Sequence, residues 1–320
     1  DVWGGTFWDS PDLWIRNHDD GGTAHQPPEF GQDNWFHARV RNRSASAMAR
    51  HFVVSFHARG FAGTQFSWPA DFLPAISAKA DFELGPGASR IVKARWPANR
   101  VPPAGTHTCL LAAALSRGDE PAAGQHVWER NNLAQKNLTV VDLVPGEFFI
   151  LPVVIAHRLA GFRRRHELEL WRREGSEALA VSLVHRSERF FALAEHAKPQ
   201  RFVPNARDER IDPAALDCGG PLPDDHHHHD QRDGSALIDS RHPELVSRQF
   251  GAAFALPLPP KPTTTLAVDL PSGQQRVGLL VQVDPKAKPG QRHRLHLVQR
   301  QGPQIVGGVA LEICVRGRTG

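Results

Sequence analysis

The sequence predicts an all-β protein built from two tandem antiparallel β-sandwich domains, with a long irregular loop in the second. Three observations lead to this fold class. Apolar and polar residues alternate with a period of two along most of the chain, which is typical of half-buried strands. Turns rich in Gly, Pro and Asn separate these segments. The first 145 residues contain no apolar pattern that predicts a helix of three turns.

The first two clear strands lie at 34–42 and 50–59. Phe36, Ala38 and Val40 share one face of the first segment, and polar and charged side chains dominate the other face. The second segment shows the same alternation, and the polar stretch "RSASAMA" between the two predicts a turn.

The remaining strands of the first domain follow at short intervals, and the turn "GPG" at 85–87 separates two of them. We expect these strands at 80–84, 89–96, 107–115 and 133–143. Strands at this spacing, joined by such turns, predict a sandwich of seven or eight antiparallel strands.

A domain boundary is predicted within "LVPGE", 143–147, because Pro145 and Gly146 interrupt the strand pattern and a new apolar segment starts at once. The domains are therefore expected at 1–144 and 145–320. So short a connection holds two domains close together rather than tethering them flexibly.

The second domain repeats the strand rhythm, except between 187 and 245, where the sequence is polar and rich in Pro and Gly. A loop of this length within a compact domain is functional or mobile. The strands of this domain are predicted at 147–155, 167–174, 179–186, 249–258, 263–270, 275–284, 292–300 and 304–315.

Residues 1–143 contain a series of segments whose order resembles the immunoglobulin-like, cell-adhesion-related domains of bacteria, often called CARDB-like. The segments are "SPDLWIRN" (10–17), "GQDNWFHARVRNRSASA" (31–47), "LGPGASRIVKARWP" (84–97), "GTHTCLLAAAL" (105–115) and "NNLAQKNLTVVDL" (131–143). The N-x-A-x-x-N core of "NNLAQKN" is the most specific of them. The resemblance implies an immunoglobulin-like sandwich from a large bacterial surface or secreted protein. The second half has only the general pattern of another sandwich.

The asparagines of this motif have a structural interpretation. Asn side chains cap turns and tolerate left-handed backbone. We expect Asn131 and Asn132 to close the turn into the last strand of the first domain, and Asn137 to present its amide to a neighbouring loop. A buried amide is costly unless it is hydrogen-bonded, so such residues fix one loop conformation.

A run of four histidines flanked by carboxylates, "DDHHHHD", is the sharpest chemical feature of the chain. Imidazole and carboxylate ligands bind Zn²⁺, Ni²⁺ or Cu²⁺. Successive residues cannot all reach one ion, so alternate histidines would act in pairs with an aspartate as a third ligand. The other interpretation is a solvated loop that binds Zn²⁺ or Ni²⁺ weakly and incidentally. The candidate ligands are Asp224, His226, His227, His228, His229 and Asp230.

A second possible metal site lies near the start of the chain, where Asp9, Asp12, Asp19 and Asp20 occur around glycines. Hard carboxylate oxygens bind Ca²⁺. The spacing does not match an EF-hand, however, and an Asp- and Gly-rich turn explains the residues equally well.

The segment "GFAGTQFSWPADFLP", 60–74, is an aromatic loop that no strand pattern absorbs. It either packs over the end of the sandwich or forms an exposed patch for a partner protein or a glycan. On the second interpretation Phe61, Phe66, Trp68 and Phe72 are the partner-binding anchors.

Composition narrows the function further. The formal charge is +4 on 320 residues, and the densest basic stretch, 157–174, also carries Glu167, Glu169 and Glu174. We expect a solvated strand pair there rather than a phosphate-binding surface, which argues against nucleic acid as a partner. No apolar run reaches the roughly 18 residues of a membrane helix.

Three cysteines are too few for a disulfide scaffold; Cys109 is expected to be a buried thiol, and pairing of Cys218 with Cys314 stays open. Because the chain begins with Asp1, we expect a processed or excised part of a longer protein.

We find none of the common catalytic motifs, such as GxSxG, HExxH or GxxxxGK[ST], in the sequence. We therefore expect a non-enzymatic structural or interaction module, of adhesion type, in a bacterial extracellular or multiprotein assembly, with a protein partner or self-assembly. The alternatives are a glycan- or metal-binding module and the accessory domains of a secreted hydrolase. An extracellular or cell-surface location is expected, and a cytoplasmic one stays open.

Overall fold

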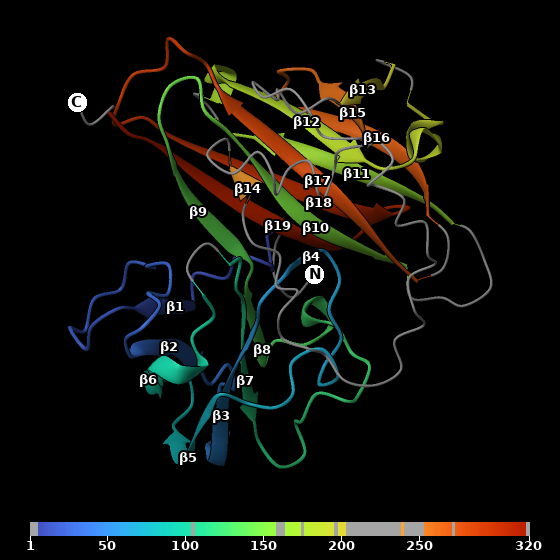
Figure 1. Ribbon diagram of the computed structural model, residues 1–320. Coiled ribbons are helices and arrows are strands. Elements are labelled where there is room, and N and C mark those ends of the chain that lie inside the picture. Colours follow the sequence, from blue (N-terminus) through green and yellow to red (C-terminus); the bar gives the residue numbers. More distant parts are fainter. Residues whose placement is uncertain are drawn as a thin grey trace.

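The computed structural model describes residues 6–103, 106–157, 164–173, 176–194, 198–202, 238–239, 253–270 and 273–317. The described elements are strands and short 3₁₀ helices, η1 (Ala98–Arg100), η2 (Val127–Glu129), η3 (Ser176–Ala178) and η4 (Glu188–Phe191). The all-β fold class is confirmed. Two sandwiches lie against each other, and the chain passes from the last strand of the first directly into a strand of the second (Figure 1).

The first sandwich has a three-stranded and a four-stranded sheet. The smaller sheet, in spatial order, contains β1 (Leu13–Arg16), β2 (Asn34–Arg41) and β6 (Ser89–Trp96). The larger sheet contains β5 (Ser77–Leu84), β3 (Ala49–Arg59), β7 (Cys109–Leu115) and β8 (Leu133–Lys136).

The alternation seen in the sequence builds the core between these two sheets. Phe36 and Ala38 of β2 are buried in the same cluster as Phe52, Val54 and Phe56 of β3. Phe36 lies stacked between Phe56 and Trp96, with ring centroids 5.2 and 4.7 Å apart. At the predicted "GPG" turn, Gly87 has a φ of +68°, a conformation that glycine adopts without steric cost.

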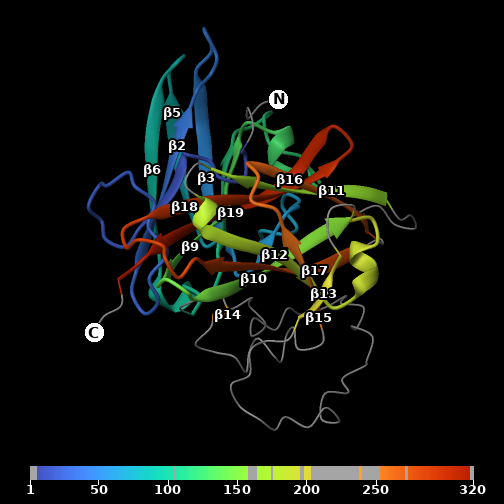
Figure 2. The same cartoon turned by 90° about the horizontal axis from the view of Figure 1, so that it is seen from above.

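The second sandwich has a five-stranded and a seven-stranded sheet (Figure 2). The five-stranded sheet contains β16 (Thr263–Leu270), β11 (Arg164–Arg172), β18 (Arg292–Gln301), β19 (Gln304–Val315) and β9 (Leu138–Leu143). The other sheet contains β13 (Gln200–Phe202), β15 (Ala253–Leu258), β12 (Leu179–His185), β17 (Gly273–Val283), β10 (Phe148–His157) and β14 (Ile238–Asp239), and β4 (Ala62–Gly63) pairs with β10.

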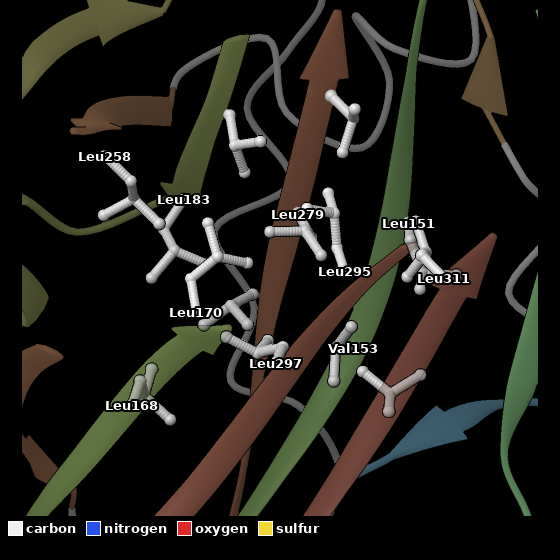
Figure 3. Packing of buried hydrophobic residues seen from close by; sticks show 14 of the residues in the cluster. Leu151, Val153, Leu168, Leu170, Leu183, Leu258, Leu279, Leu295, Leu297 and Leu311 are labelled. Atoms are coloured by element: carbon white, nitrogen blue, oxygen red, sulfur yellow. The ribbon is translucent and has the colours of Figure 1, made fainter. Parts of the chain in front are cut away.

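Branched aliphatic side chains fill the space between these two sheets. Figure 3 shows Leu168, Leu170 and Leu297 from one sheet facing Leu183 and Leu279 from the other. All five are at most 1% exposed, so water is excluded from the centre of the sandwich. Burying such side chains supplies the main favourable term for folding.

One predicted strand is wrong in a way that matters for the whole molecule. Residues 133–143 do not form a single strand that closes the first sandwich: β8 ends at Lys136, and β9 begins at Leu138 in a sheet of the second sandwich. β8 pairs antiparallel with β7, whereas β9 pairs parallel with β19. Both segments have strand periodicity, and periodicity alone does not tell which sheet a strand joins. The sheets therefore change at Asn137, before the boundary predicted at 144/145.

The pairing is antiparallel everywhere among the described strands except at β9–β19 and β4–β10. Both parallel pairs connect the first part of the chain with the second sandwich. The sequence "VDPKAKPGQRHRLHLVQ" also predicts a hairpin, and this prediction is wrong. A turn containing Gly290, with a φ of +89°, joins β17 to β18, but β17 lies in the seven-stranded sheet and β18 in the five-stranded sheet, so the turn crosses between the two sheets. The sequence did not predict β1, β4, β13 or β14, all of four residues or fewer.

Candidate functional site

The most elaborate group of polar side chains in the described residues lies between the two sandwiches, and we call it the junction. Asn137, where the chain changes sheets, is at its centre and is fully buried. Its main-chain N–H donates to Trp8 O (2.6 Å), and its carbonyl oxygen accepts from Ala310 N–H (2.8 Å). Its side-chain Nδ2 donates to Gly63 O (2.7 Å) and Gly308 O (2.6 Å). We predicted that Asn137 presents its amide to a neighbouring loop; the amide is hydrogen-bonded as expected, but its acceptors lie in the strands β4 and β19.

His107 completes the hydrogen bonds of this amide. Its Nε2 lies 2.7 Å from Asn137 Oδ1, and its Nδ1 contacts the hydroxyl of Thr139. Because Asn137 Oδ1 can only accept, Nε2 carries the proton and Nδ1 accepts from Thr139. Burial lowers the pKa of His107 to about 4, so the ring is neutral at pH 7. A neutral ring with both nitrogens occupied is a structural bridge rather than a free acid or base.

An ion triad with a buried Asp9–Lys136 pair and a partly exposed Arg294 forms the second part of the junction. Asp9 contacts Lys136 Nζ at 2.8 Å through one carboxylate oxygen and Arg294 through the other. The side chains of Asp9 and Lys136 are 7% and 8% exposed, and their main chains form a β-bridge. Arg294 lies on β18 of the second sandwich, so the triad ties the start of the chain to both sandwiches. Removing one partner of such a group leaves an uncompensated buried charge.

The two sandwiches also approach each other closely at Gly307 and Gly308 of β19. A Cβ at Gly307 would overlap the carbonyl group of Thr64, and a Cβ at Gly308 would lie 2.6 Å from the indole ring of Trp8. The Trp8 indole N–H donates to His296 Nδ1 (3.2 Å). Only glycine fits at these two positions, because backbone and an aromatic ring occupy the space of a side chain.

The edge contact β4–β10 adds a backbone connection to the junction. Ala62 and Gly63 pair with Val153 and Val154, and Thr64 N–H donates to Val154 O (3.0 Å). A segment of the first half of the chain is thus an additional strand of the second sandwich.

The aromatic loop 60–74 is core packing, and the expectation of an exposed patch is wrong for three of its four anchors. Phe66, Trp68 and Phe72 are 3%, 9% and 1% exposed, and Phe61 is half-buried against them. They cover the outer face of the four-stranded sheet and contact the second sandwich. The cluster contains Phe7, Trp8, Phe66, Trp68, Phe72, Cys109, Leu111, Ala113, Val127, Leu133, Val298 and Ala310.

The physical reason lies in β7, whose sequence "CLLAAAL" is apolar on both faces. Such a strand must be covered on both sides, and the loop supplies the second cover. Cys109 is a buried free thiol as predicted, and burial raises its pKa to about 12. Asn132 closes the turn before β8 as predicted, since its Nδ2 donates to Ala114 O (3.2 Å) and Asp119 O (2.5 Å).

A cavity of about 100 Å³ adjoins the junction. The imidazole rings of His25 and His107 line the cavity, together with four prolines. His25 Nδ1 accepts from Ile15 N–H (3.2 Å), and burial, with Lys136 and Arg294 adding to it, lowers the pKa of His25 to about 3. The cavity is lined by His25, Pro27, Pro28, Pro102, Pro103, Thr106, His107, Thr108, Leu110, Leu138, Thr139 and Val140. Neutral imidazoles and hydroxyls can hold water or a small neutral molecule by hydrogen bonds.

The four aspartates considered for Ca²⁺ are not brought together. Asp9 belongs to the ion triad, and Asp12 contacts Arg39 and Arg41 at 3.1 Å. Asp19 and Asp20 pair with basic side chains of the three-stranded sheet, Lys93 and Arg16. These carboxylates therefore fasten loops and strands through ion pairs.

The histidine run and its flanking carboxylates, Asp224, His226, His227, His228, His229 and Asp230, lie outside the described residues, as does Cys218. Cys314 is a free, buried thiol. The residues that the structure describes contain no cluster of three His, Cys, Asp or Glu side chains able to hold a metal ion. The same part of the chain has no helix long and apolar enough to cross a membrane.

Sequence reasoning found Asn137 but missed the residues around it. Asp9, Lys136 and Arg294 are far apart in the sequence, and no spacing rule links them. The pair Gly307–Gly308 within a strand was an available indication, because glycine inside a strand marks a close backbone approach.

Comparisons with known proteins add little to this picture. No family model matches the chain, and no curated protein matches it. Among solved structures, the C-terminal domain of the Streptococcus pyogenes antigen I/II-family protein AspA aligns with 8% sequence identity over 95% of this chain and 99% of that chain, with a TM-score of 0.21. A likeness at this level carries no argument about fold or function.

Proposed function

We propose that this chain is a non-enzymatic structural module in which two β-sandwiches act together as one rigid spacer. The observation that carries the proposal is the junction. Asn137, the ion triad and the glycine pair of β19 fix the first sandwich on the second through hydrogen bonds, charge pairs and close packing. A connection of this kind permits one relative orientation, because each buried polar group loses its partner when the sandwiches move.

The apolar part of the junction supports the same conclusion. Phe7, Trp8 and the loop 60–74 form one cluster with Val298 and Ala310 of the second sandwich. Interfaces between domains of one chain that move freely are more polar than this. A spacer holds its two ends at a constant distance, which is the property that this packing provides.

The wider setting follows the family resemblance of residues 1–143. We place the module in a bacterial extracellular or cell-surface assembly, as a CARDB-like domain followed by a second sandwich. The placement rests on the resemblance of residues 1–143 alone; the hydrogen bonds of Asn132 and Asn137 show that the motif "NNLAQKN" has a structural role in this fold. A protein partner or a second copy of the chain is expected at the ends of the spacer.

Distance measurements between spin labels test the proposal. Labels on Ser46→Cys in the first sandwich and Lys288→Cys in the second sit on exposed turns. A Cys218→Ser background leaves Cys109 and Cys314, which are buried. A rigid spacer gives one narrow distance distribution. Asn137→Ala should broaden it and Asn131→Ala, at an exposed position of the same motif, should not. A broad or bimodal distribution in the parent protein would refute the spacer.

A further inference from the structure

The connection from the first sandwich runs directly into a parallel strand pair. β9 lies at the edge of its sheet and pairs with β19 from Leu138↔Ala310 to Leu143↔Val315. Main-chain hydrogen bonds extend the pair at both ends: Ala310 N–H donates to Asn137 O and Arg316 N–H donates to Leu143 O, each at 2.8 Å.

The direction of this pair decides how it responds to tension. A pull on the first sandwich reaches β9 at its first residue, Leu138, because the chain enters there from Asn137. A pull on the residues after β19 reaches that strand at its last residue, Val315. In a parallel pair these two points lie at opposite ends of the ladder. The two strands are therefore loaded in shear, and their backbone hydrogen bonds carry the force together.

An antiparallel pair would respond differently. The entry of β9 and the exit of β19 would then lie at the same end, and tension would open the ladder one pair at a time. The parallel arrangement of β9 and β19 is one of only two parallel pairs among the described strands, in a chain whose other described pairs are antiparallel.

The neighbouring contacts show where the chain yields. β19 is held on its other side by β18 over ten residue pairs from Arg292↔Cys314 to Gln301↔Gln304. Among the described strands, β19 is the only neighbour of β9 in the sheet. The side chain of Leu143 is anchored in the core of the second sandwich, and Asp142 pairs with Arg316 at 3.0 Å. The β9–β19 contact is therefore the weaker side of β19 and the one that must separate first.

We infer that the module bears mechanical load, with the β9–β19 pair as its clamp, resisting tension applied between the first sandwich and the residues after β19. This inference rests on the proposed spacer function, because only a spacer within an assembly transmits force from one end to the other.

Single-molecule pulling with two attachment geometries tests the clamp. One handle is placed on Ser46→Cys in the first sandwich in both cases, again in the Cys218→Ser background. The second handle is placed on Gly317→Cys, after β19, or on Gln304→Cys, at the start of β19; both positions are exposed. The first geometry loads β9 and β19 in shear, and the second loads them from the same end.

We expect the rupture force in the shear geometry to exceed that in the peeling geometry by about twofold or more at equal loading rate, since forced unfolding reports the barrier to separation. The surface substitutions leave the core intact, which circular dichroism and melting curves verify. Equal forces in the two geometries would overturn the clamp. If the distance distribution of the spacer stays narrow in that case, the load-bearing inference fails while the spacer survives.

A cross-link across the pair identifies the rupture site. Val140 and Glu312 are register partners in β9 and β19. Val140→Cys with Glu312→Cys, oxidised to a disulfide, should abolish the first rupture event in the shear geometry, and reduction should restore it. An unchanged first event in a chain whose cross-link is verified by mass would place the rupture elsewhere and overturn the assignment.

Discussion

The amide of Asn137 donates a 2.6 Å hydrogen bond to the carbonyl oxygen of Gly308 on β19, a strand of the other sandwich. The same nitrogen donates to Gly63 O at 2.7 Å. One side chain therefore holds together the point where the chain changes sheets, the strand β4 and the strand β19. Its substitution gives the most direct test of the junction.

Asn137→Ala should lower the free energy of unfolding by about 3 kcal/mol or more. The change leaves two buried carbonyl oxygens and the His107 Nε2–H without partners, and each unsatisfied group costs about 1–3 kcal/mol. Urea titration measures the loss. Asn131→Ala is the matched control, because Asn131 is exposed and such substitutions change stability by less than about 0.5 kcal/mol. Similar losses for both variants would contradict the assigned role of Asn137.

Trp68→Ala and Phe72→Ala should each destabilise the fold by about 3–5 kcal/mol, the usual cost of emptying a buried aromatic site. Leu73→Ala, in the same loop but 52% exposed, should have little effect. Thermal melts and particle mass measured side by side decide the question. A variant with an unchanged melting temperature but a changed particle mass would show that the loop binds a partner or a second copy of the chain instead of packing in the core.

Gly307→Ala should separate the sandwiches without unfolding either core, because a methyl group there would overlap the Thr64 carbonyl. We expect a lower melting temperature, two resolved melting steps and a more extended particle in small-angle X-ray scattering. Gly85→Ala is the control, since nothing lies within 4 Å of a Cβ at that position. A normal single melt for Gly307→Ala would show that the close approach does not exist in solution.

Stability should fall as the pH is lowered from about 6.5 toward 4. Burial lowers the pKa of His57, His107 and His296 to about 4 and that of His25 to about 3, against 6.5 for an exposed histidine. Below pH 6.5 these histidines become protonated in the unfolded chain but stay neutral in the folded protein. Lowering the pH therefore favours unfolding. The slope is at most about 1.4 kcal/mol per pH unit for each histidine.

Urea midpoints at pH 7.5 and 5.0 measure this dependence. Carboxylates do not interfere in that window, because their ordinary pKa values lie near 4 and below. His107→Gln should reduce the slope by about one quarter if these four histidines contribute equally. A midpoint that is independent of pH would mean that these rings become protonated within the folded protein.

Much of the architecture could be predicted from the sequence, and the reasons are physical. Alternation is a local property, so β2, β6, β16 and β19 were predicted within one residue of their ends. Asn137 was recognisable because a buried amide next to a strand needs partners. The strand bounds thus follow from each segment's own side chains.

The assignment of β9 to the second sandwich could not be predicted in this way. Val140 and Val141 suit any sheet, and their position is decided by their register partners Glu312 and Ile313 at the far end of the chain. The loop 60–74 shows the same limit: Phe66 and Phe72 are apolar enough for a binding patch or a core. The sequence of β7 is apolar on both faces, so one face needs a cover besides the core. Only this property of β7, considered together with the loop, distinguishes core packing from a binding patch.

The pairing of β9 with β19 also has a consequence for synthesis. A ribosome releases β9 long before β19, and at about 5–20 residues per second the wait is on the order of ten seconds or more. The first sandwich has all its own strands by Lys136, but Leu138–Leu143 emerges as an apolar edge without its partner. On a polysome, the β19 of a neighbouring nascent chain is an equally good partner, so exchange of this strand between chains is the characteristic assembly error that this topology invites.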